Sequence, residues 1–128
     1  MKKLLFLLLL AAASLTSCQS QNQTASEDEG VLPVEKYQAK LAEMEGAQLL
    51  DVRTPKEYED GHIEGAVNID YFDENFLSQA EQRFNKDQPV MLYCRSGNRS
   101  AKATAIMKEA GFKEIYDLKG GYMQWPKE

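Results

Sequence analysis

Residues 31–128 alternate between short apolar runs and longer stretches with helical periodicity, and this alternation limits the possible folds more than any other feature of the chain. Short apolar runs are typical of buried strands, whereas apolar residues three or four positions apart indicate amphipathic helices. Because strands that alternate with helices favour a parallel sheet, we predict one α/β domain with helices on both faces of the sheet. The expected strands are 47–52, 66–69, 89–93 and 114–118, and the expected helices are 33–44, 55–60, 72–84 and 99–110.

The composition excludes several classes of protein. A chain of 128 residues has room for one domain, and its 15 basic and 20 acidic side chains give a net charge of −5. An acidic surface repels phosphates, so we expect no nucleic-acid partner. Two cysteines and one histidine are too few for a disulfide-stapled scaffold or an ordinary structural zinc site, so we expect no metal.

Residues 1–17 have the pattern of a signal peptide. Lys2 and Lys3 precede an apolar run over 4–13, which is too short for a membrane span of ~20 residues and suits the core of a signal peptide. The next segment ends in Leu-Thr-Ser-Cys, which resembles the lipobox of bacterial lipoproteins. That resemblance implies cleavage before Cys18 and acylation of its thiol and amine. An ordinary cleavage site that leaves Cys18 unmodified is the alternative.

Residues 18–30 are predicted to form a flexible tether between the lipid and the domain. Ala25 is the one apolar residue of 19–30, so the segment cannot offset its ordering entropy by burial. Removal of residues 1–17 takes away two lysines and no acids, which leaves a net charge of −7. We therefore expect a protein of the bacterial cell envelope, held at a membrane by its lipid, with its domain outside the cytoplasm.

Residues 94–99 are predicted to form a reactive loop. It reads Cys-Arg-Ser-Gly-Asn-Arg and joins an apolar strand directly to a helix. In this position the backbone N–H groups of a loop can curl around one side chain, and the helix dipole adds positive potential. Arg95 and Arg99 add two cations, and Gly97 permits backbone conformations closed to other residues. Such a cradle favours the thiolate of Cys94 as a nucleophile, and it would equally hold the terminal sulfur of a persulfide.

Three motifs in order along the chain resemble those of the single-domain rhodaneses, a family of sulfurtransferases. The six-residue loop 94–99 opens with Cys and closes with a basic residue, as the active loop of that family often does. Residues 49–69 fill every named position of the signature D-V-R-x-x-x-E-[YF]-x-x-G-H-I-x-G-A-x-N-I. Gly120, Gly121 and Trp125 fit the C-terminal G-G-x-x-x-W. The resemblance covers nearly the whole domain and implies a rhodanese-like α/β fold.

The resemblance also implies a reaction. The Cys94 thiolate would take the outer, sulfane sulfur from a donor such as thiosulfate and pass it, as a persulfide, to cyanide or a thiol. Because the persulfide is itself the carrier, no organic cofactor is expected. The loop residues expected to bind substrate are Ser96, Gly97, Asn98 and Arg99, through their amides, and Arg95 with Arg99, through their charges.

Four further residues are expected to support the site. Asp51 and Arg53 carry opposite charges near the end of a strand and are expected to pair or to cap loops. Glu57 is expected to close the start of the following helix and to reach Arg53. His62, the one histidine, could form a Cys–His pair with Cys94, but the resemblance makes it a loop-fixing residue.

Two other functions stay open. Certain Cys-dependent phosphatases and arsenate reductases share the fold but use a C-x5-R loop, whereas Arg99 here completes the shorter C-x4-R. A tethered, non-catalytic binding module is the second alternative, although rhodanese-like modules of that kind often lack the cysteine. With Cys18 lipidated, Cys94 would be the remaining thiol, so its sulfur would pass to another molecule, such as an envelope thiol protein. We expect the domain to be a monomer.

Overall fold

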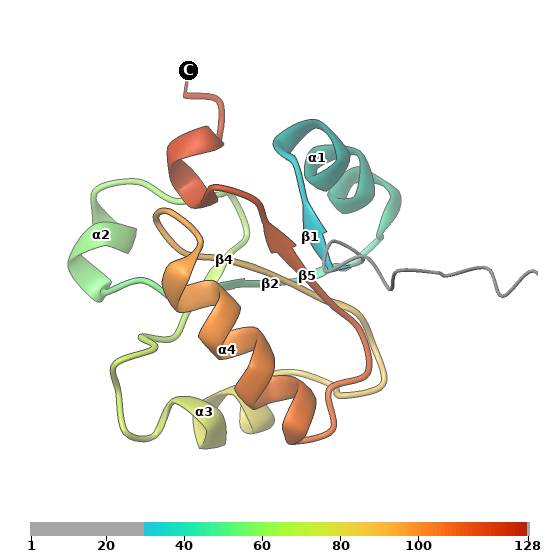
Figure 1. The fold of residues 1–128 in the computed structure, drawn as a ribbon, viewed down its shortest axis with the longest axis vertical. Helices are drawn as coiled ribbons and strands as arrows, with labels where there is room; N and C mark the ends of the chain where they lie inside the picture. Colours follow the sequence, from blue (N-terminus) through green and yellow to red (C-terminus); the bar gives the residue numbers. More distant parts are fainter. Residues whose placement is uncertain (1–29, 128) are drawn as a thin grey trace, which may run out of the picture.

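The computed structural model describes residues 30–127, which form a five-stranded parallel sheet covered by helices (Figure 1). The strand order is β1-β5-β4-β2-β3, and every pair of neighbouring strands is parallel. This architecture confirms the predicted fold class. The elements are β1 (Val31–Leu32), α1 (Val34–Glu43), β2 (Gln48–Asp51), α2 (Pro55–Glu59), β3 (Val67–Asn68), α3 (Phe76–Arg83), β4 (Val90–Tyr93), α4 (Asn98–Glu109), β5 (Ile115–Leu118) and the 3₁₀ helix η1 (Gly121–Gln124). The expected signal peptide, Cys18 and most of the expected tether lie outside the described residues.

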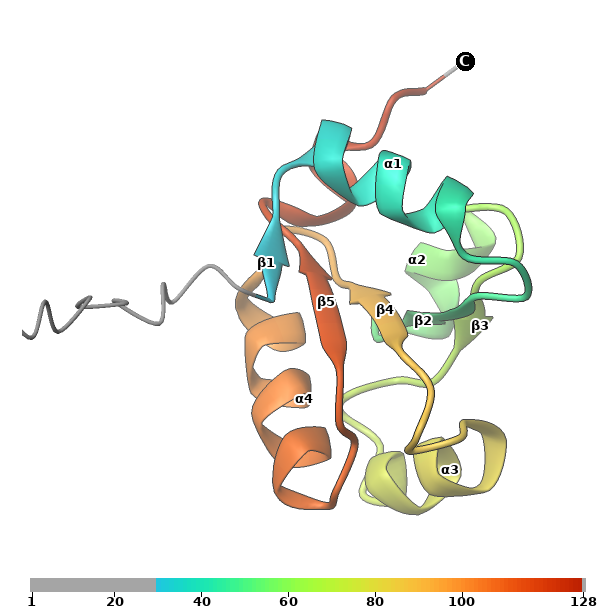
Figure 2. The ribbon, with the colours of Figure 1, turned by 90° about the vertical axis from the view of Figure 1, so that its right-hand side faces the viewer.

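The sheet separates two apolar cores. Helices α3 and α4 lie on one side of the strands and α1 lies on the other (Figures 1 and 2). Successive residues of a strand point to opposite faces, so Leu50 and Leu92 join the core under α3 and α4, whereas Met91 packs beneath α1 with Tyr37. All four residues of β4 are buried, as expected for a central strand of a parallel sheet.

The structure differs from the sequence-based expectation in two places. Strand β1 was not expected, because two residues are too few to show a period; it is held by its pairing with β5. Helix α3 begins at Phe76 rather than near Phe72, which is 67% exposed. The side chain of Asp70 accepts the backbone N–H of Phe72, and that of Asp73 accepts the N–H of Asn75, so two local turns replace the first helical turn.

The topology places the reactive loop at the point where the order of the strands reverses, between β2 and β4. From β2 the chain passes to β3 on one side and then crosses back to β4 on the other side. The C-terminal ends of β2 and β4 lie next to each other because Asp51 pairs in register with Tyr93. In parallel sheets, ligands bind at such a switch point, beyond the carboxyl ends of the strands. Residues following Asp51 and Tyr93 therefore converge on one edge.

The C-terminal segment packs against the back of the reactive loop. The Tyr122 N–H donates to the Cys94 carbonyl oxygen at 2.7 Å, and the Met123 N–H donates to that of Arg95 at 3.1 Å. Gly121 has a φ of 68° and lies so near the loop that an added Cβ would overlap the Arg95 backbone and come within 2.6 Å of the Cys94 carbonyl oxygen. Trp125 contacts the Tyr37 ring edge-on, with 6.3 Å between ring centroids, so it packs the end of the domain as expected.

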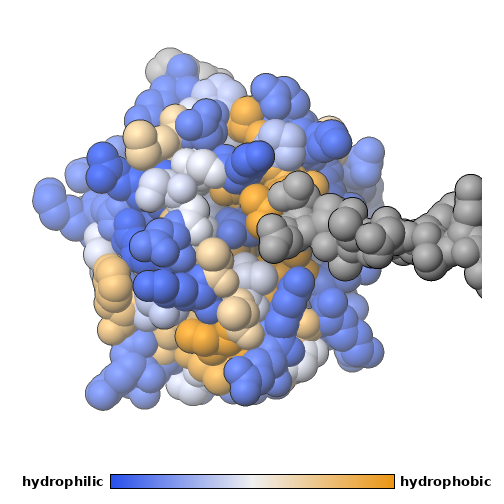
Figure 3. All heavy atoms as spheres, in the orientation of Figure 1, coloured by the Kyte–Doolittle hydropathy of each residue, from blue (hydrophilic) through white to orange (hydrophobic). Residues whose placement is uncertain are grey.

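The face of the domain seen in Figure 3 is largely polar. Figure 3 shows one face on which hydrophilic residues surround small apolar patches. Within residues 30–127, no helix is both long enough and apolar enough to cross a membrane.

Gly121→Ala should destabilise the domain by at least ~3 kcal/mol, because the new methyl group meets backbone that cannot move without disturbing the loop. Gly46→Ala is the matched control, since Gly46 has nearly the same φ, 65°, and nothing within 4 Å of its Cβ position. The control should cost only about 1 kcal/mol, from the left-handed backbone alone. Urea unfolding of both variants measures the difference, and equal costs would contradict the close approach.

Candidate active site

Cys94 lies directly after β4, where the chain turns into α4. The side chain is 1% exposed, the Gly97 N–H donates to its Sγ atom at 3.0 Å, and the Ser100 hydroxyl lies 3.3 Å from the same atom. The turn needs a glycine, because Gly97 has a φ of 109°, a region that other residues rarely adopt. Strand β4 and helix α4 thus fix the sulfur at the N-terminus of a twelve-residue helix.

The cradle around the sulfur is partly formed. The sequence predicted that the amides of Ser96, Gly97, Asn98 and Arg99 hold the sulfur; among residues 30–127, Gly97 is the one that donates a backbone N–H to Sγ. A thiol sulfur sits closer to its own backbone than the outer atom of a persulfide would. The N–H groups in the first turn of α4 have no acceptor within the helix, so they stay available to an atom beyond Sγ.

Arg99, which was expected to attract an anionic substrate through its charge, is held in an ion pair. Its guanidinium forms a bidentate ion pair with Glu57, with distances of 2.7 and 3.0 Å, and lies 5.6 Å from the Phe72 ring centroid. The hydrogen bonds from Arg99 are the largest cause that lowers the pKa of Glu57 to about 2. Arg99 therefore joins the start of α4 to α2 and is largely neutralised by that partner.

Glu57 closes the start of α2 as expected but does not reach Arg53. It forms a capping box with Thr54: the Glu57 N–H donates to the Thr54 hydroxyl, and the Glu57 carboxylate accepts the Thr54 N–H. The expected contact with Arg53 is wrong because Arg99, at the start of α4, supplies the guanidinium and Arg53 is engaged elsewhere.

Arg53 and Asp51 form the expected ion pair, and the pair is buried. The Arg53 side chain donates to both Asp51 oxygens, the shortest contact being 2.7 Å, and also donates to the Gly61 carbonyl oxygen at 2.7 Å. The guanidinium carbon lies 4.3 Å from the Tyr122 ring centroid and 5.5 Å from that of Tyr93. Buried charges need this degree of pairing, so the residues around Arg53 are fixed in place.

His62 is exposed and contacts Tyr58. Its Nδ1 atom lies 2.8 Å from the Tyr58 carbonyl oxygen, and the two rings stack with centroids 3.7 Å apart. The Ile63 N–H next to it donates to the Tyr93 hydroxyl at 3.0 Å. These contacts tie the loop after α2 to β4 and agree with a loop-fixing role for His62.

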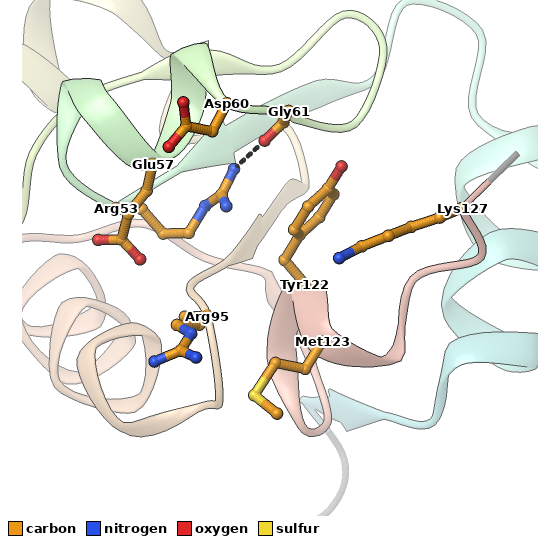
Figure 4. Close-up of a pocket in the computed structure, with 8 residues that line it drawn as sticks. All are labelled: Arg53, Glu57, Asp60, Gly61, Arg95, Tyr122, Met123 and Lys127. Atoms are coloured by element: carbon orange, nitrogen blue, oxygen red, sulfur yellow. Dashed lines mark hydrogen bonds between the residues drawn. The ribbon is translucent and has the colours of Figure 1, made fainter.

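A pocket of about 410 Å³ opens beside the reactive loop (Figure 4). Arg95, on the loop, is exposed and forms no ion pair within residues 30–127, whereas Lys127 extends toward the Tyr122 ring, 5.4 Å from its centroid. Three lining residues, Tyr122, Met123 and Lys127, were not predicted as site residues; their place behind the Gly-Gly turn was the available signal. The full lining is Arg53, Glu57, Asp60, Gly61, Arg95, Tyr122, Met123 and Lys127.

Two buried polar residues near the loop were also missed. Ser100 is fully buried in the first turn of α4, and Asp117, in β5, is 3% exposed. A serine or aspartate has no distinctive sequence pattern at such positions, so only the packing of α4 on β5 identifies them.

Comparisons with known proteins agree with this geometry, an α/β domain with a cysteine between a central strand and a helix. A profile of the rhodanese-like domain matches residues 34–128, so the chain belongs to the rhodanese-like domain family. The chain is 49% identical over 82 residues to an uncharacterised protein of Bacillus subtilis, YqhL, a match that covers 62% of this chain and 60% of that protein.

Matches to two further proteins cover a larger share of those proteins. Thiosulfate sulfurtransferase 18 of Arabidopsis thaliana is 36% identical over 113 residues, or 80% of this chain and 83% of that protein. The crystal structure of a rhodanese-like domain protein from Staphylococcus aureus superposes with a TM-score of 0.65 at 28% identity, covering 77% of this chain and 92% of that one. The chain is thus a rhodanese-like domain with sulfurtransferase homologues.

Glu57→Gln should lower the free energy of unfolding by ~1–2 kcal/mol at pH 7, because it removes the ion pair with Arg99 and keeps a side chain suited to the capping box. The lowered pKa of Glu57 means that its stabilisation is complete above its ordinary value of 4.5 and is lost as the pH falls through about 2. The variant and the parent should therefore converge as the pH falls, in urea unfolding between pH 7 and 3. Glu59→Gln, on an exposed residue of the same helix, is the control; an equal effect there would contradict the role of the pair.

Proposed function

We propose that this chain is a sulfurtransferase that carries sulfur as a persulfide on Cys94. The observation that carries the proposal is the environment of the Cys94 Sγ atom, which is buried at the N-terminus of α4 and receives the Gly97 N–H at 3.0 Å. Oriented N–H groups and a helix dipole favour an anionic sulfur at that point. The name of the Arabidopsis relative, a thiosulfate sulfurtransferase, supports the same reaction.

The proposed reaction has two steps. In the first, the Cys94 thiolate attacks the outer sulfur of thiosulfate; a new S–S bond forms, the bond to the sulfonate sulfur breaks, and sulfite leaves with its electron pair. In the second, cyanide or a thiolate attacks the outer sulfur of the persulfide, and the S–S bond breaks to return the Cys94 thiolate. The N–H groups of the first turn of α4 would stabilise the outer sulfur between the steps.

The pocket beside the loop supports an anionic donor. Arg95 is free of ion pairs within residues 30–127, and Lys127 adds a second cation at the pocket wall. The nearby acids are engaged, since Glu57 is paired with Arg99 and Asp60 lies 3.8 Å from the Lys56 ammonium. The mouth of the site is therefore locally positive on an acidic protein, which would steer a small anion toward Cys94.

Cys94→Ser should abolish sulfur transfer from thiosulfate to cyanide, because the persulfide cannot form, while circular dichroism should show an intact fold. Cys18→Ala, which removes the other cysteine, should keep the parent rate. Peptide mass spectrometry after incubation with thiosulfate should find one added sulfur atom on Cys94 in the parent.

The same assays separate the other two functions. Faster cleavage of an aryl phosphate than transfer of sulfur in the parent would favour a phosphatase. Neither activity, with no sulfur added to Cys94, would favour a binding module.

We also propose that the domain is anchored in the bacterial cell envelope through a lipid on Cys18. The support is the Leu-Thr-Ser-Cys sequence after a short apolar run. Cys18→Ala should move the protein from the membrane fraction to the aqueous phase in detergent partitioning, or block removal of residues 1–17. Partitioning that does not change would contradict the lipid anchor.

A further inference from the structure

A second pocket, which we call the side pocket, opens between the end of α1, the loop after α2 and the C-terminal segment. Its volume is about 700 Å³, within the range of ~300–1,000 Å³ typical of small-molecule sites. Leu41, Tyr122 and Trp125 are half-buried, so each packs partly on the core beneath α1 and leaves a surface for the pocket. The exposed Glu64 and Lys127 add one charge of each sign. The full lining is Leu41, His62, Ile63, Glu64, Tyr122, Trp125, Pro126 and Lys127.

The side pocket meets the pocket beside the reactive loop. Tyr122 and Lys127 line both pockets, and Figure 4 shows the Tyr122 ring between Arg53 and Lys127. The Tyr122 N–H donates to the Cys94 carbonyl oxygen, so the residue that separates the two pockets is fixed relative to the loop. A molecule that lies across Tyr122 would therefore occupy the side pocket and reach the reactive loop at the same time.

The burial of Cys94 limits what can reach its sulfur. The side chain is 1% exposed, so an acceptor must present a narrow group to the outer sulfur of a persulfide. Cyanide is narrow enough, and so is a thiol on the single methylene group of a cysteine side chain. Cyanide, however, is too small to use a pocket of about 700 Å³. The side pocket therefore suits an acceptor that holds a cysteine thiol and an apolar group on one backbone.

We propose that the side pocket binds an apolar side chain of a peptide acceptor whose cysteine thiol takes the sulfur from Cys94. This inference rests on the proposed function and names the class of its acceptor. The peptide thiolate attacks the outer sulfur of the Cys94 persulfide; a new S–S bond forms on the peptide, and the old S–S bond breaks and leaves its electron pair on the Cys94 thiolate. Burial of the apolar side chain against Leu41 and Trp125 supplies affinity, and Lys127 attracts a carboxylate of the same peptide.

Paired acceptor peptides test the proposal. The full chain is given thiosulfate with acetyl-Cys-Leu or acetyl-Cys-Ser, and further pairs carry one or two glycines between the two residues. The peptide persulfide is trapped with iodoacetamide and measured by mass spectrometry, with Cys94→Ser as the uncatalysed background. At least one Leu peptide should have a kcat/KM about tenfold above that of its Ser partner, because the Leu side chain leaves water on binding. Equal values in every pair would overturn the proposal.

Leu41→Asn assigns the preference to the side pocket. The substitution keeps a similar side-chain size but makes the wall polar, so the preference for the Leu peptide over its Ser partner should fall to about twofold or less. Met44→Asn is the matched control, because Met44 is half-buried at the end of α1, packs against the same core and does not line the side pocket. The control should keep the preference of the parent. Loss of the preference in both variants, or in neither, would contradict the site.

A binding measurement separates this inference from the proposed function. Trp125 is the single tryptophan of the chain and lines the side pocket, so its fluorescence reports on an occupant. The same Leu peptides with Ser in place of Cys cannot accept sulfur, yet at least one should change the fluorescence saturably and bind about fivefold more weakly to Leu41→Asn. Saturable binding without sulfur transfer to cyanide would reject the proposed function alone. Transfer to cyanide with neither binding nor peptide preference would reject the side pocket alone.

Discussion

The buried ion pair of Arg53 and Asp51 holds together the parts that make the site. Arg53 follows β2, reaches the Gly61 carbonyl oxygen in the loop after α2, and lies against the rings of Tyr93 and Tyr122. One guanidinium therefore joins the ends of two central strands, a loop and the C-terminal segment. Loss of either charge would leave its partner buried and unpaired, a cost large enough to loosen all four segments.

Three arginines lie at the mouth of the site, and two of them are held in ion pairs with acidic side chains. Arg53 and Arg99 are held by Asp51 and Glu57, so each contributes little net field outside its pair. Arg95 is exposed and forms no ion pair among the described residues, and it belongs to the loop that carries Cys94. An incoming anion would thus meet the positive charge beside the sulfur.

The sequence predicted the layers, the parallel sheet and the position of Cys94, because apolar periodicity and a cysteine between a strand and a helix are local signals. It did not predict that Glu57 pairs with Arg99, since those residues are far apart in the chain and meet only when α2 and α4 close over the sheet. Asp117 was missed for a related reason. It is one polar residue inside an apolar strand, and its burial depends on how α4 packs on β5.

Hydrogen bonds from the C-terminal segment hold the reactive loop, residues 94–99, at its present size. The carbonyl oxygens of Cys94 and Arg95 are held by the N–H groups of Tyr122 and Met123, and Gly121 leaves no space between the two segments. A C-x4-R loop clamped in this way cannot widen outward without breaking those hydrogen bonds. A phosphoryl group needs donors for three equatorial oxygens, whereas a persulfide presents one compact sulfur, so under the proposed function a loop held at this size would suit sulfur. Under the proposed function, the Gly-Gly turn would thereby support the choice of substrate from behind the loop.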